Sequence, residues 1–346
     1  MAKEKILLKE NDLLIEEKDS VMDIRDLEIE NNATVAPDDS ESYEGGDEAA
    51  TEMPAVKKER KKRWGDRCDG RLLRTLTPFS RVIPFIMPRR SDAQNYFEDI
   101  IDITAIEDYI AEKHAAGYKN VGLLHVIIAA YVRTIAQRPG VNRFVAGQRV
   151  YARKGITGVM TIKKYLAVDS PDTSIKVNFD PYDTVLDVCR KFTDTAEKAL
   201  SANTDFDKTA AKLVKMPRFL FRAAIRFLMW LDYHGRLPKS LLNVSPFHGS
   251  FVITSMGSLG IDAIYHHIYD FGNLPVFISY GKKITRNVIE KDGTVTAHHY
   301  ITFRVVTDER ICDGYYYASA FKLLKRYMLH PDWLDVPPRE ILEDID

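Results

Sequence analysis

Two periodicities of apolar and polar side chains alternate along the chain from about Arg71 onward. Apolar residues at every second position predict β-strands, and these dominate the last third of the sequence. The predicted strands are NYFEDIIDIT (95–104), the hairpin NRFVAGQRVYARKG (142–155), GVMTIKKYLAV (158–168), SFVITSMG (250–257), PVFISYGKK (275–283) and TVTAHHYITFRVV (294–306). The Asp292-Gly293 dipeptide supplies the turn of a hairpin that leads into the last of these strands.

Apolar residues that recur every three or four positions predict helices between these strands. Capping boxes at Thr104/Glu107 and Thr184/Asp187 open two of them. The strongly apolar run 123–138 predicts a third helix, and a fourth follows the last strand. Antiparallel hairpins and helices mix here without a regular βαβ rhythm. The pattern therefore predicts an α/β fold, a two-layer sandwich in which a mixed β-sheet is covered by helices.

The segment 216–235, MPRFLFRAAIRFLMWLDYHG, predicts a helix that starts after Pro217 and ends at Gly235. Its arginines fall at every fourth position and form one narrow stripe on an otherwise apolar surface. Such a helix packs in the core or between subunits, or it lies on an anionic membrane as a peripheral contact through Pro217–His234. The two interpretations differ in whether protein covers the apolar face.

Charge separates the N-terminal segment from the rest of the chain. Residues 1–56 hold five Lys/Arg against seventeen Asp/Glu. Residues 1–62 are predicted to be a disordered acidic segment that ends in the basic cluster KKERKKRW, with a folded domain from 63 to 346. The acidic segment is either simply solvated or folds back over a basic face as a regulator. Because a short charge run is usually a solvated flank, no nucleic-acid partner is predicted.

The number of cysteines and the length of the apolar runs indicate the cellular compartment. Cys68, Cys189 and Cys312 are odd in number and lack paired spacing, so neither a disulfide framework nor a metal site is predicted. MAKEKILLKE does not resemble a secretory signal, and no run of eighteen apolar residues occurs. These features predict a cytoplasmic protein.

The stretch 303–328 carries the most specific motif, because a β-branched strand ends in a sharp turn and a helix follows. ERICDG (309–314) in this turn resembles the H-x-x-x-D-G motif of chloramphenicol acetyltransferases and of 2-oxoacid dehydrogenase acyltransferase catalytic domains. GSFVITSMGSLG (249–260), 137–164 and 292–314 resemble other segments of that family in the same order. The resemblance spans about Arg71 to Asp335, with an inserted apolar and basic helical segment at 201–250.

The resemblance implies a coenzyme A-dependent acyltransferase that acts on a small-molecule acyl acceptor. It also implies a homotrimer whose active sites lie between protomers. By position, Asp313 matches the aspartate that holds the motif loop, and Gly314 matches the glycine. Thr254 matches the hydroxyl residue that steadies the oxyanion, with Ser255 as a less certain candidate. Glu309 occupies the position of the motif histidine, which takes a proton from the attacking group.

The replacement of histidine by Glu309 leaves two hypotheses open. A histidine has a pKa of about 6.5, near the operating pH, whereas a glutamate has about 4.3. The chain is therefore either an acyltransferase with an atypical base or a catalytically inactive relative that acts as a binding or scaffolding trimer. His248, which precedes the hydroxyl strand, is a candidate surrogate base. Strand alternation predicts that Arg310 points away from Glu309.

Two more departures from the family concern the N-terminal side. No lipoyl domain is predicted, since the N-terminal segment is short and acidic. Pro84 and Pro88 are expected to interrupt the helix that opens the catalytic domain. Arg89 and Arg90 are candidates for an arginine that pairs with Asp313.

Overall fold

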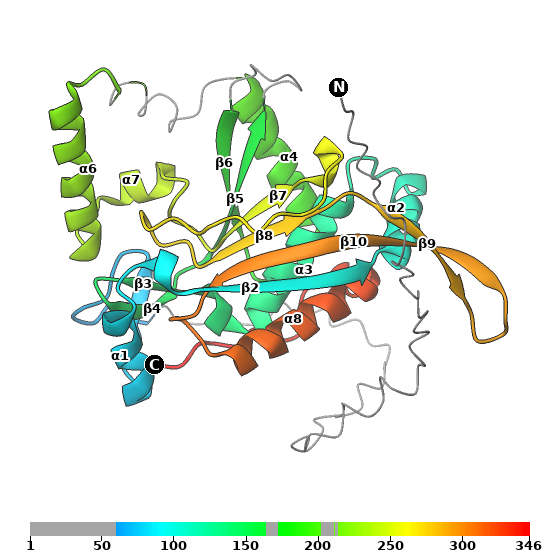
Figure 1. The fold of residues 1–346 in the computed structure, drawn as a ribbon, viewed down its shortest axis with the longest axis horizontal. Coiled ribbons are helices and arrows are strands. Elements are labelled where there is room, and N and C mark those ends of the chain that lie inside the picture. The colour runs from blue at the N-terminus through cyan, green and yellow to red at the C-terminus, as the bar shows by residue number, and fades with distance from the viewer. Residues whose placement is uncertain (1–59, 164–171, 202–210, 212–213) are drawn as a thin grey trace, which may run out of the picture. The chain divides into compact units, whose positions relative to one another are not determined.

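A mixed seven-stranded sheet organises the chain (Figure 1). The structure, a computed structural model, describes residues 60–163, 172–201, 211 and 214–346. The strand order is β2-β10-β8-β7-β5-β6, with β9 paired to β10. Pairing is parallel between β5 and β7 and between β7 and β8, and antiparallel elsewhere. The strands are β2 (Gln94–Asp102), β5 (Ile156–Lys163), β6 (Asp172–Phe179), β7 (Phe251–Ser255), β8 (Val276–Tyr280), β9 (Ile284–Ile289) and β10 (Val295–Asp308).

A second, three-stranded sheet has the order β1-β4-β3. Its strands are β1 (Gly70–Leu72), β3 (Arg143–Ala146) and β4 (Arg149–Arg153). The β3–β4 hairpin turns at Gly147 and Gln148, which have φ angles of 55° and 58°. A Cβ on Gly147 would lie 2.3 Å from the Tyr233 carbonyl oxygen, so this turn requires glycine.

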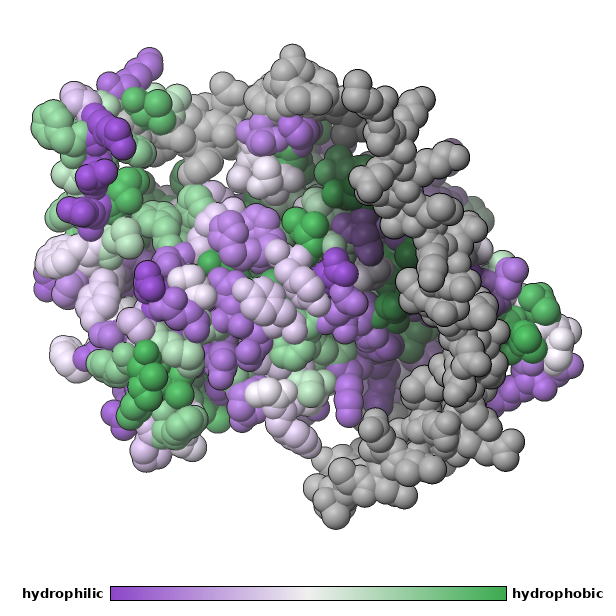
Figure 2. Space-filling model, viewed as in Figure 1, coloured by the Kyte–Doolittle hydropathy of each residue, from purple (hydrophilic) through white to green (hydrophobic). Residues whose placement is uncertain are grey.

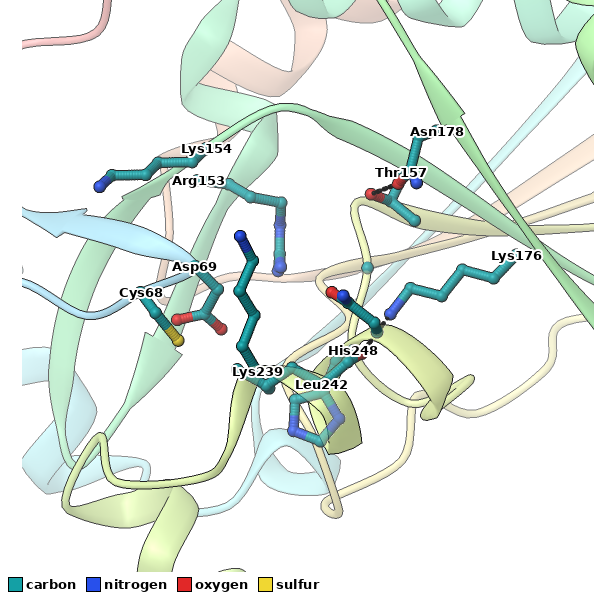
Figure 3. A pocket seen from close by; sticks show the side chains of 12 residues that line it. Cys68, Asp69, Arg153, Lys154, Thr157, Lys176, Asn178, Lys239, Leu242 and His248 are labelled. Carbon is teal, nitrogen blue, oxygen red and sulfur yellow. Dashed lines mark hydrogen bonds between the residues drawn. The ribbon is translucent and has the colours of Figure 1, made fainter. Parts of the chain in front are cut away.

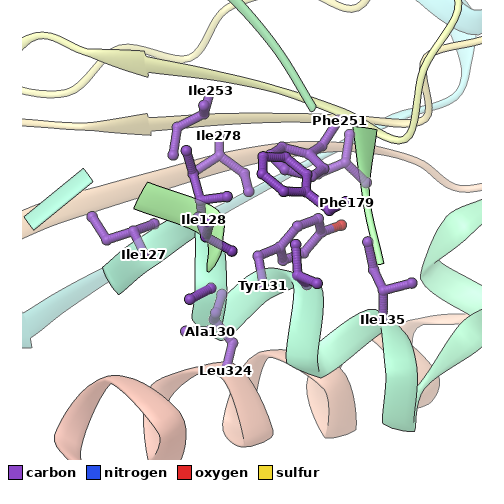
Figure 4. Close-up of a cluster of buried hydrophobic side chains, with 14 of the residues drawn as sticks. Ile127, Ile128, Ala130, Tyr131, Ile135, Phe179, Phe251, Ile253, Ile278 and Leu324 are labelled. Atoms are coloured by element: carbon purple, nitrogen blue, oxygen red, sulfur yellow. The ribbon is translucent and has the colours of Figure 1, made fainter. Parts of the chain in front are cut away.

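Four helices contribute to the main core on one face of the large sheet: α2 (Thr104–Ala115), α3 (Leu123–Gln137), α4 (Val185–Ser201) and α8 (Gly314–Leu329). Figure 4 shows α3 side chains packed against strand residues. The Tyr131 and Phe251 rings meet edge to face with centroids 4.9 Å apart. Because Ile253 and Ile278 also enter this cluster, alternate residues of β7 and β8 fill it. The predicted two-layer α/β sandwich with a mixed sheet is confirmed.

The opposite face of the sheet carries a smaller apolar cluster. Val159, Val252 and Phe277 project from three adjacent strands and pack with Ile268 and Leu274 of the β7–β8 connection. The remaining helices are α1 (Pro78–Ile86), α6 (Arg218–Tyr233) and α7 (Lys239–Val244), and the 3₁₀ turns are η2 (Arg90–Asp92), η3 (Pro139–Asn142), η4 (Gly257–Leu259) and η5 (Pro331–Leu334). No helix within the described residues is long and apolar enough to cross a membrane.

Helix α6 forms where the sequence predicts it, yet none of its residues is buried. Phe219 is 72% exposed and Trp230 is 47% exposed. Figure 2 shows hydrophobic residues over α6 at upper left and over α1 at lower left. The interpretation that α6 packs into the core of its own chain is therefore wrong. Packing between subunits stays a prediction.

Two local predictions fail for identifiable reasons. Thr104 is the first residue of α2 instead of its cap, because its hydroxyl accepts the His299 N–H at 3.0 Å. Pro84 lies inside α1 instead of interrupting it, because the missing N–H leaves only one bond unmade in the last turn of a nine-residue helix.

Other local predictions are confirmed or lie outside the described residues. The predicted capping box at α4 forms, with the Asp187 N–H donating to the Thr184 hydroxyl at 3.3 Å. Helix α3 ends at Gln137, just before Pro139, as predicted. The N-terminal segment 1–59 and parts of the inserted segment 201–250 lie outside the described residues.

Candidate active site

Glu309 is the first residue after β10, and its side chain is exposed. Its backbone N–H donates to the Ala93 carbonyl at 2.9 Å, which ties the turn to the start of β2. In the part of the chain that the structure describes, no side chain pairs with the Glu309 carboxylate. The structure thus presents an accessible, unpaired carboxylate at a strand end.

A buried cluster of ion pairs holds the residue that precedes Glu309. Asp308 is fully buried, and its carboxylate contacts Arg90 at 3.1 Å and Arg310 at 2.7 Å. Arg310 also donates to the Met87 and Pro88 carbonyls at 3.1 and 3.2 Å. Burial lowers the pKa of the Arg90 guanidinium. One carboxylate held by two guanidiniums leaves the residue before Glu309 little freedom to move.

Arg310 is buried and paired with Asp308, so the prediction that it does not face Glu309 fits the structure. Asp308 itself is a residue that the sequence analysis missed. Its signal was an acidic residue at the end of a β-branched strand, followed two positions later by an arginine.

Asp313 caps α8 instead of pairing with an arginine. Its carboxylate accepts the Tyr316 N–H at 2.8 Å, and α8 starts at Gly314. Arg89, one of the two candidate partners, instead contacts Asp92 at 3.0 Å. The pairing of Asp313 with Arg89 or Arg90 is therefore wrong, and Asp313 instead fixes the start of α8.

Thr254 lies far from Glu309 within one chain. The sheet register places Thr254 opposite Ser279, and Ser279 opposite Arg304. Glu309 lies five residues beyond Arg304, which corresponds to roughly 17 Å at the rise of an antiparallel strand. The structure brings Glu309 and Asp313 together on one turn, but it does not bring them to Thr254.

Thr254 lines a cavity of about 340 Å³ on the face of the sheet that carries the smaller apolar cluster. The wall includes Val159, Val252, Phe277 and His266. No described residue hydrogen-bonds the Thr254 hydroxyl, so it is available to a ligand. A largely apolar wall with a free hydroxyl can orient a small organic molecule.

Ser255 is engaged elsewhere. As the next residue along the strand, it faces away from Thr254. Its hydroxyl accepts the Ser258 N–H at 3.4 Å and hydrogen-bonds Tyr280. Thr254 is therefore the better-placed hydroxyl of the pair.

His248 precedes β7 and is 3% exposed. Its Nδ1 lies 2.8 Å from the Ser245 hydroxyl, and its Nε2 lies 3.4 Å from an Asp232 carboxylate oxygen, close but not aligned as a hydrogen bond. Burial lowers the pKa of the His248 imidazole, and contact with Asp232 opposes this only in part. His248 lines a second cavity, of about 400 Å³, which is separate from the one beside Thr254 (Figure 3).

Three further histidines, His266, His298 and His299, make contacts within the fold. His298 lies 2.6 Å from Asp102, and His299 pairs with Glu107. The His266 ring stacks on Phe277 with centroids 4.2 Å apart. Among the described residues, no group of three or more His, Cys, Asp or Glu side chains could hold a metal ion.

Comparison with known proteins gives only distant likenesses. No family model matches the chain, and no curated protein sequence matches it. A probable dihydrolipoamide acetyltransferase from Listeria monocytogenes superposes with a TM-score of 0.48 at 16% identity, covering 75% of this chain and 95% of that one. A catalytic core of the 2-oxoacid dehydrogenase multienzyme complex from Thermoplasma acidophilum gives 0.47 at 14%, covering 76% and 100%. A chloramphenicol acetyltransferase gives 0.44 at 10%, covering 75% and 99%.

Proposed function

We propose that the chain is an acyltransferase that moves an acyl group between coenzyme A and a small-molecule acceptor. The observation that carries this proposal is the unpaired carboxylate of Glu309 on a rigid strand-turn-helix. A general base must be accessible and held in one geometry. The buried Asp308 cluster and the Asp313 cap restrain the turn from both ends. The resemblance of ERICDG to the acyltransferase motif supplies the class of reaction.

The proposed roles follow from these surroundings. Glu309 takes the proton of the attacking thiol, hydroxyl or amine, and Thr254 donates its free hydroxyl to the oxyanion that forms on the acyl carbon. Asp313 and Gly314 hold the motif turn. Ser255, whose hydroxyl is already hydrogen-bonded, is the second candidate for the oxyanion donor. His248 is the second candidate base, because it lines a cavity and its Nε2 makes no aligned hydrogen bond in the described residues.

A homotrimer would complete the site. Within one chain, Glu309 and Thr254 are separated by roughly 17 Å along the sheet, so we propose that Glu309 of one copy meets Thr254 of another. Exposed apolar residues support association, because Phe85 on α1 is 60% exposed and Phe219 on α6 is 72% exposed. Exposed apolar side chains on the surface of each helix are typical of interaction surfaces.

Acetyl-coenzyme A turnover with panels of thiols, amines and alcohols tests the proposal. We expect Glu309→Ala to lower the rate by about 10² to 10⁴ and Thr254→Val by about 10² to 10³. Glu309→His should retain or raise the rate. Glu112→Ala, an exposed glutamate on α2, is the matched control and should leave turnover unchanged. A wild-type protein that neither binds coenzyme A nor transfers an acetyl group to any acceptor contradicts the proposal.

Subunit mixing tests the shared site separately. Glu309→Ala and Thr254→Val chains are unfolded together, refolded, and assayed against each variant alone. In randomly mixed trimers about a quarter of the sites receive both native residues, so activity should recover to about that share of the wild-type rate. Recovery no greater than in the single variants contradicts a site built from two copies.

One observation favours the alternative, a catalytically inactive relative that binds or scaffolds as a trimer. Glu309 lines neither the cavity beside Thr254 nor the one beside His248. Under this alternative, Thr254 and its cavity would hold a ligand without turnover. Turnover that disappears in Glu309→Ala would reject it.

A further inference from the structure

The cavity beside His248 is lined by an excess of basic side chains. It is partly open to solvent and has a volume of about 400 Å³, where the small sheet, strands β5 and β6 and helix α7 meet (Figure 3). Arg153, Lys154, Lys176 and Lys239 line it, and the only carboxylate among the lining residues that the structure describes is Asp69. Four cations against one carboxylate give this wall a surplus of positive charge. Lys154 and Lys239 are exposed, but Arg153 and Lys176 are partly buried, and charges in such surroundings are normally paired.

Arg153 lacks a carboxylate partner. Its Nη2 donates to the Asn273 carbonyl and side-chain oxygen at 2.8 and 3.1 Å, both neutral acceptors. Its Nε is buried and has no hydrogen-bond partner among the described residues. The guanidinium stacks on the Phe144 ring at 4.4 Å, which fixes its plane. A guanidinium that is held in one orientation and has an unused N–H donor can bind an anion.

Lys176 is likewise held by neutral groups. Its ammonium donates to the Leu242 and Ser245 carbonyls at 2.6 and 3.1 Å, at the end of α7. These two hydrogen bonds use two of the three N–H donors of the Lys176 ammonium and leave the third for a ligand. Burial, and then the charge of Arg153, lower the pKa of Lys176 to about 8. Burial also lowers the pKa of Arg153 to about 9.

The neighbouring groups do not neutralise these cations. Asp69 is already paired, since Arg67 contacts it at 2.8 Å and Asn273 donates to it at 2.9 Å. Burial lowers the pKa of His248, which favours the neutral imidazole. Figure 3 shows Lys239 directed toward the space beside Arg153. The cavity therefore carries uncompensated positive charge.

We propose that this cavity binds a phosphate group, held by Arg153, Lys176 and Lys239. A phosphate dianion supplies three or more acceptor oxygens and two negative charges, which match several separate cationic donors better than a carboxylate does. The phosphate comes either from coenzyme A, through its 3′-phosphate, or from a separate phosphorylated compound. The proposal does not depend on acyl transfer and holds for an inactive protein as well.

Calorimetric titration of the full-length chain with inorganic phosphate, at constant ionic strength, tests the site. We expect Lys176→Met and Lys239→Met each to weaken phosphate binding about 10-fold or more, the effect of losing one charge-assisted hydrogen bond. Lys239 is exposed, so its variant does not threaten folding. Lys322→Met, on α8 across the sheet, is the matched control. Absence of phosphate binding, or equal binding by all four proteins, overturns the proposal.

Coenzyme A and dephospho-coenzyme A then identify the source of the phosphate. If the 3′-phosphate occupies the cavity, coenzyme A binds about 10-fold tighter than dephospho-coenzyme A, and Lys239→Met removes the difference. If the two bind alike while inorganic phosphate still binds, a separate phosphorylated compound is the ligand. Failure of the proposed acyl transfer would appear as absent turnover and leave phosphate binding intact, so the two proposals fail in distinguishable ways.

Discussion

Helices α3 and α6 are nearly equal in length and both are rich in apolar residues, yet they have opposite surroundings. Every residue of α3 from Val126 to Ala136 is buried, whereas α6 has no buried residue. The α3 sequence carries one arginine, in its C-terminal half, and α6 carries three at every fourth position. An apolar helix is therefore not in itself a core helix, and the spacing of its charges is the more informative signal.

The attachment of the two helices differs in the same way. Helix α3 packs against the sheet and against its neighbours α4 and α8. Helix α6 is attached near its C-terminal end, where Asp232 pairs with the buried Arg67 and the Tyr233 hydroxyl donates to Gln148. Removing a side chain from α3 should therefore damage the whole fold. Removing one from the exposed apolar face of α6 should affect only what this face contacts outside its own chain.

The largest expected effect is a cavity in α3. Ile128→Ala should lower the free energy of unfolding by about 2 to 5 kcal/mol, because the side chain is 1% exposed and the surroundings cannot collapse fully. Its matched partner is Leu220→Ala on α6, 43% exposed, with an expected loss below about 0.5 kcal/mol. Urea unfolding of both variants measures the contrast. Equal losses would mean that α6 is part of the same cooperative core.

The next effect concerns the attachment of α6. Burial would raise the pKa of Asp232, but contact with His248 and Arg67 lowers it to about 2 from an ordinary 3.8. That difference is worth about 2 kcal/mol of folding stability, present above pH 4 and lost as the pH falls through 2. Asp232→Asn should therefore be less stable than wild type by about that amount at pH 7, and the gap should narrow below pH 4.

Urea unfolding at pH 7, 4 and 3 measures this gap. The control is Asp92→Asn, which removes an exposed pair with Arg89 and should cost under about 0.5 kcal/mol at each pH. A gap that is independent of pH would show that Asp232 acts through packing instead of charge.

A smaller effect is expected at a buried hydroxyl of α3. The Tyr131 hydroxyl is buried without a hydrogen-bond partner among the described residues, so Tyr131→Phe should leave stability unchanged or raise it by up to about 1 kcal/mol. Tyr317→Phe is the contrast, because that hydroxyl donates to the Asp308 carbonyl at 3.0 Å and its loss should cost about 1 kcal/mol. Thermal unfolding compares the two. A clear loss in Tyr131→Phe would reveal an ordered water or another partner at that hydroxyl.

The sequence predicts elements well where one local pattern decides them. The two-layer fold, helix α3 and the α4 capping box follow from periodicity and spacing. Thr104 fails as a cap because a backbone N–H from residue 299 takes its hydroxyl, a contact that no local pattern contains. The candidate site shows the same contrast between features set by local sequence and contacts between distant segments. Glu309 and Asp313 share a turn as their spacing predicts, but the pairing of Arg90 with Asp308 depends on how distant segments meet.

The smallest effect on stability, and the most informative about association, is expected on the exposed face of α6. Phe219→Ser should change the free energy of unfolding by less than about 0.5 kcal/mol, because the side chain is 72% exposed. If this face packs between subunits, the same variant should shift sedimentation toward the monomer. Unchanged sedimentation, together with loss of flotation on anionic liposomes, would instead assign the face to a membrane surface. The Arg218, Arg222 and Arg226 stripe would then supply the attraction to lipid headgroups.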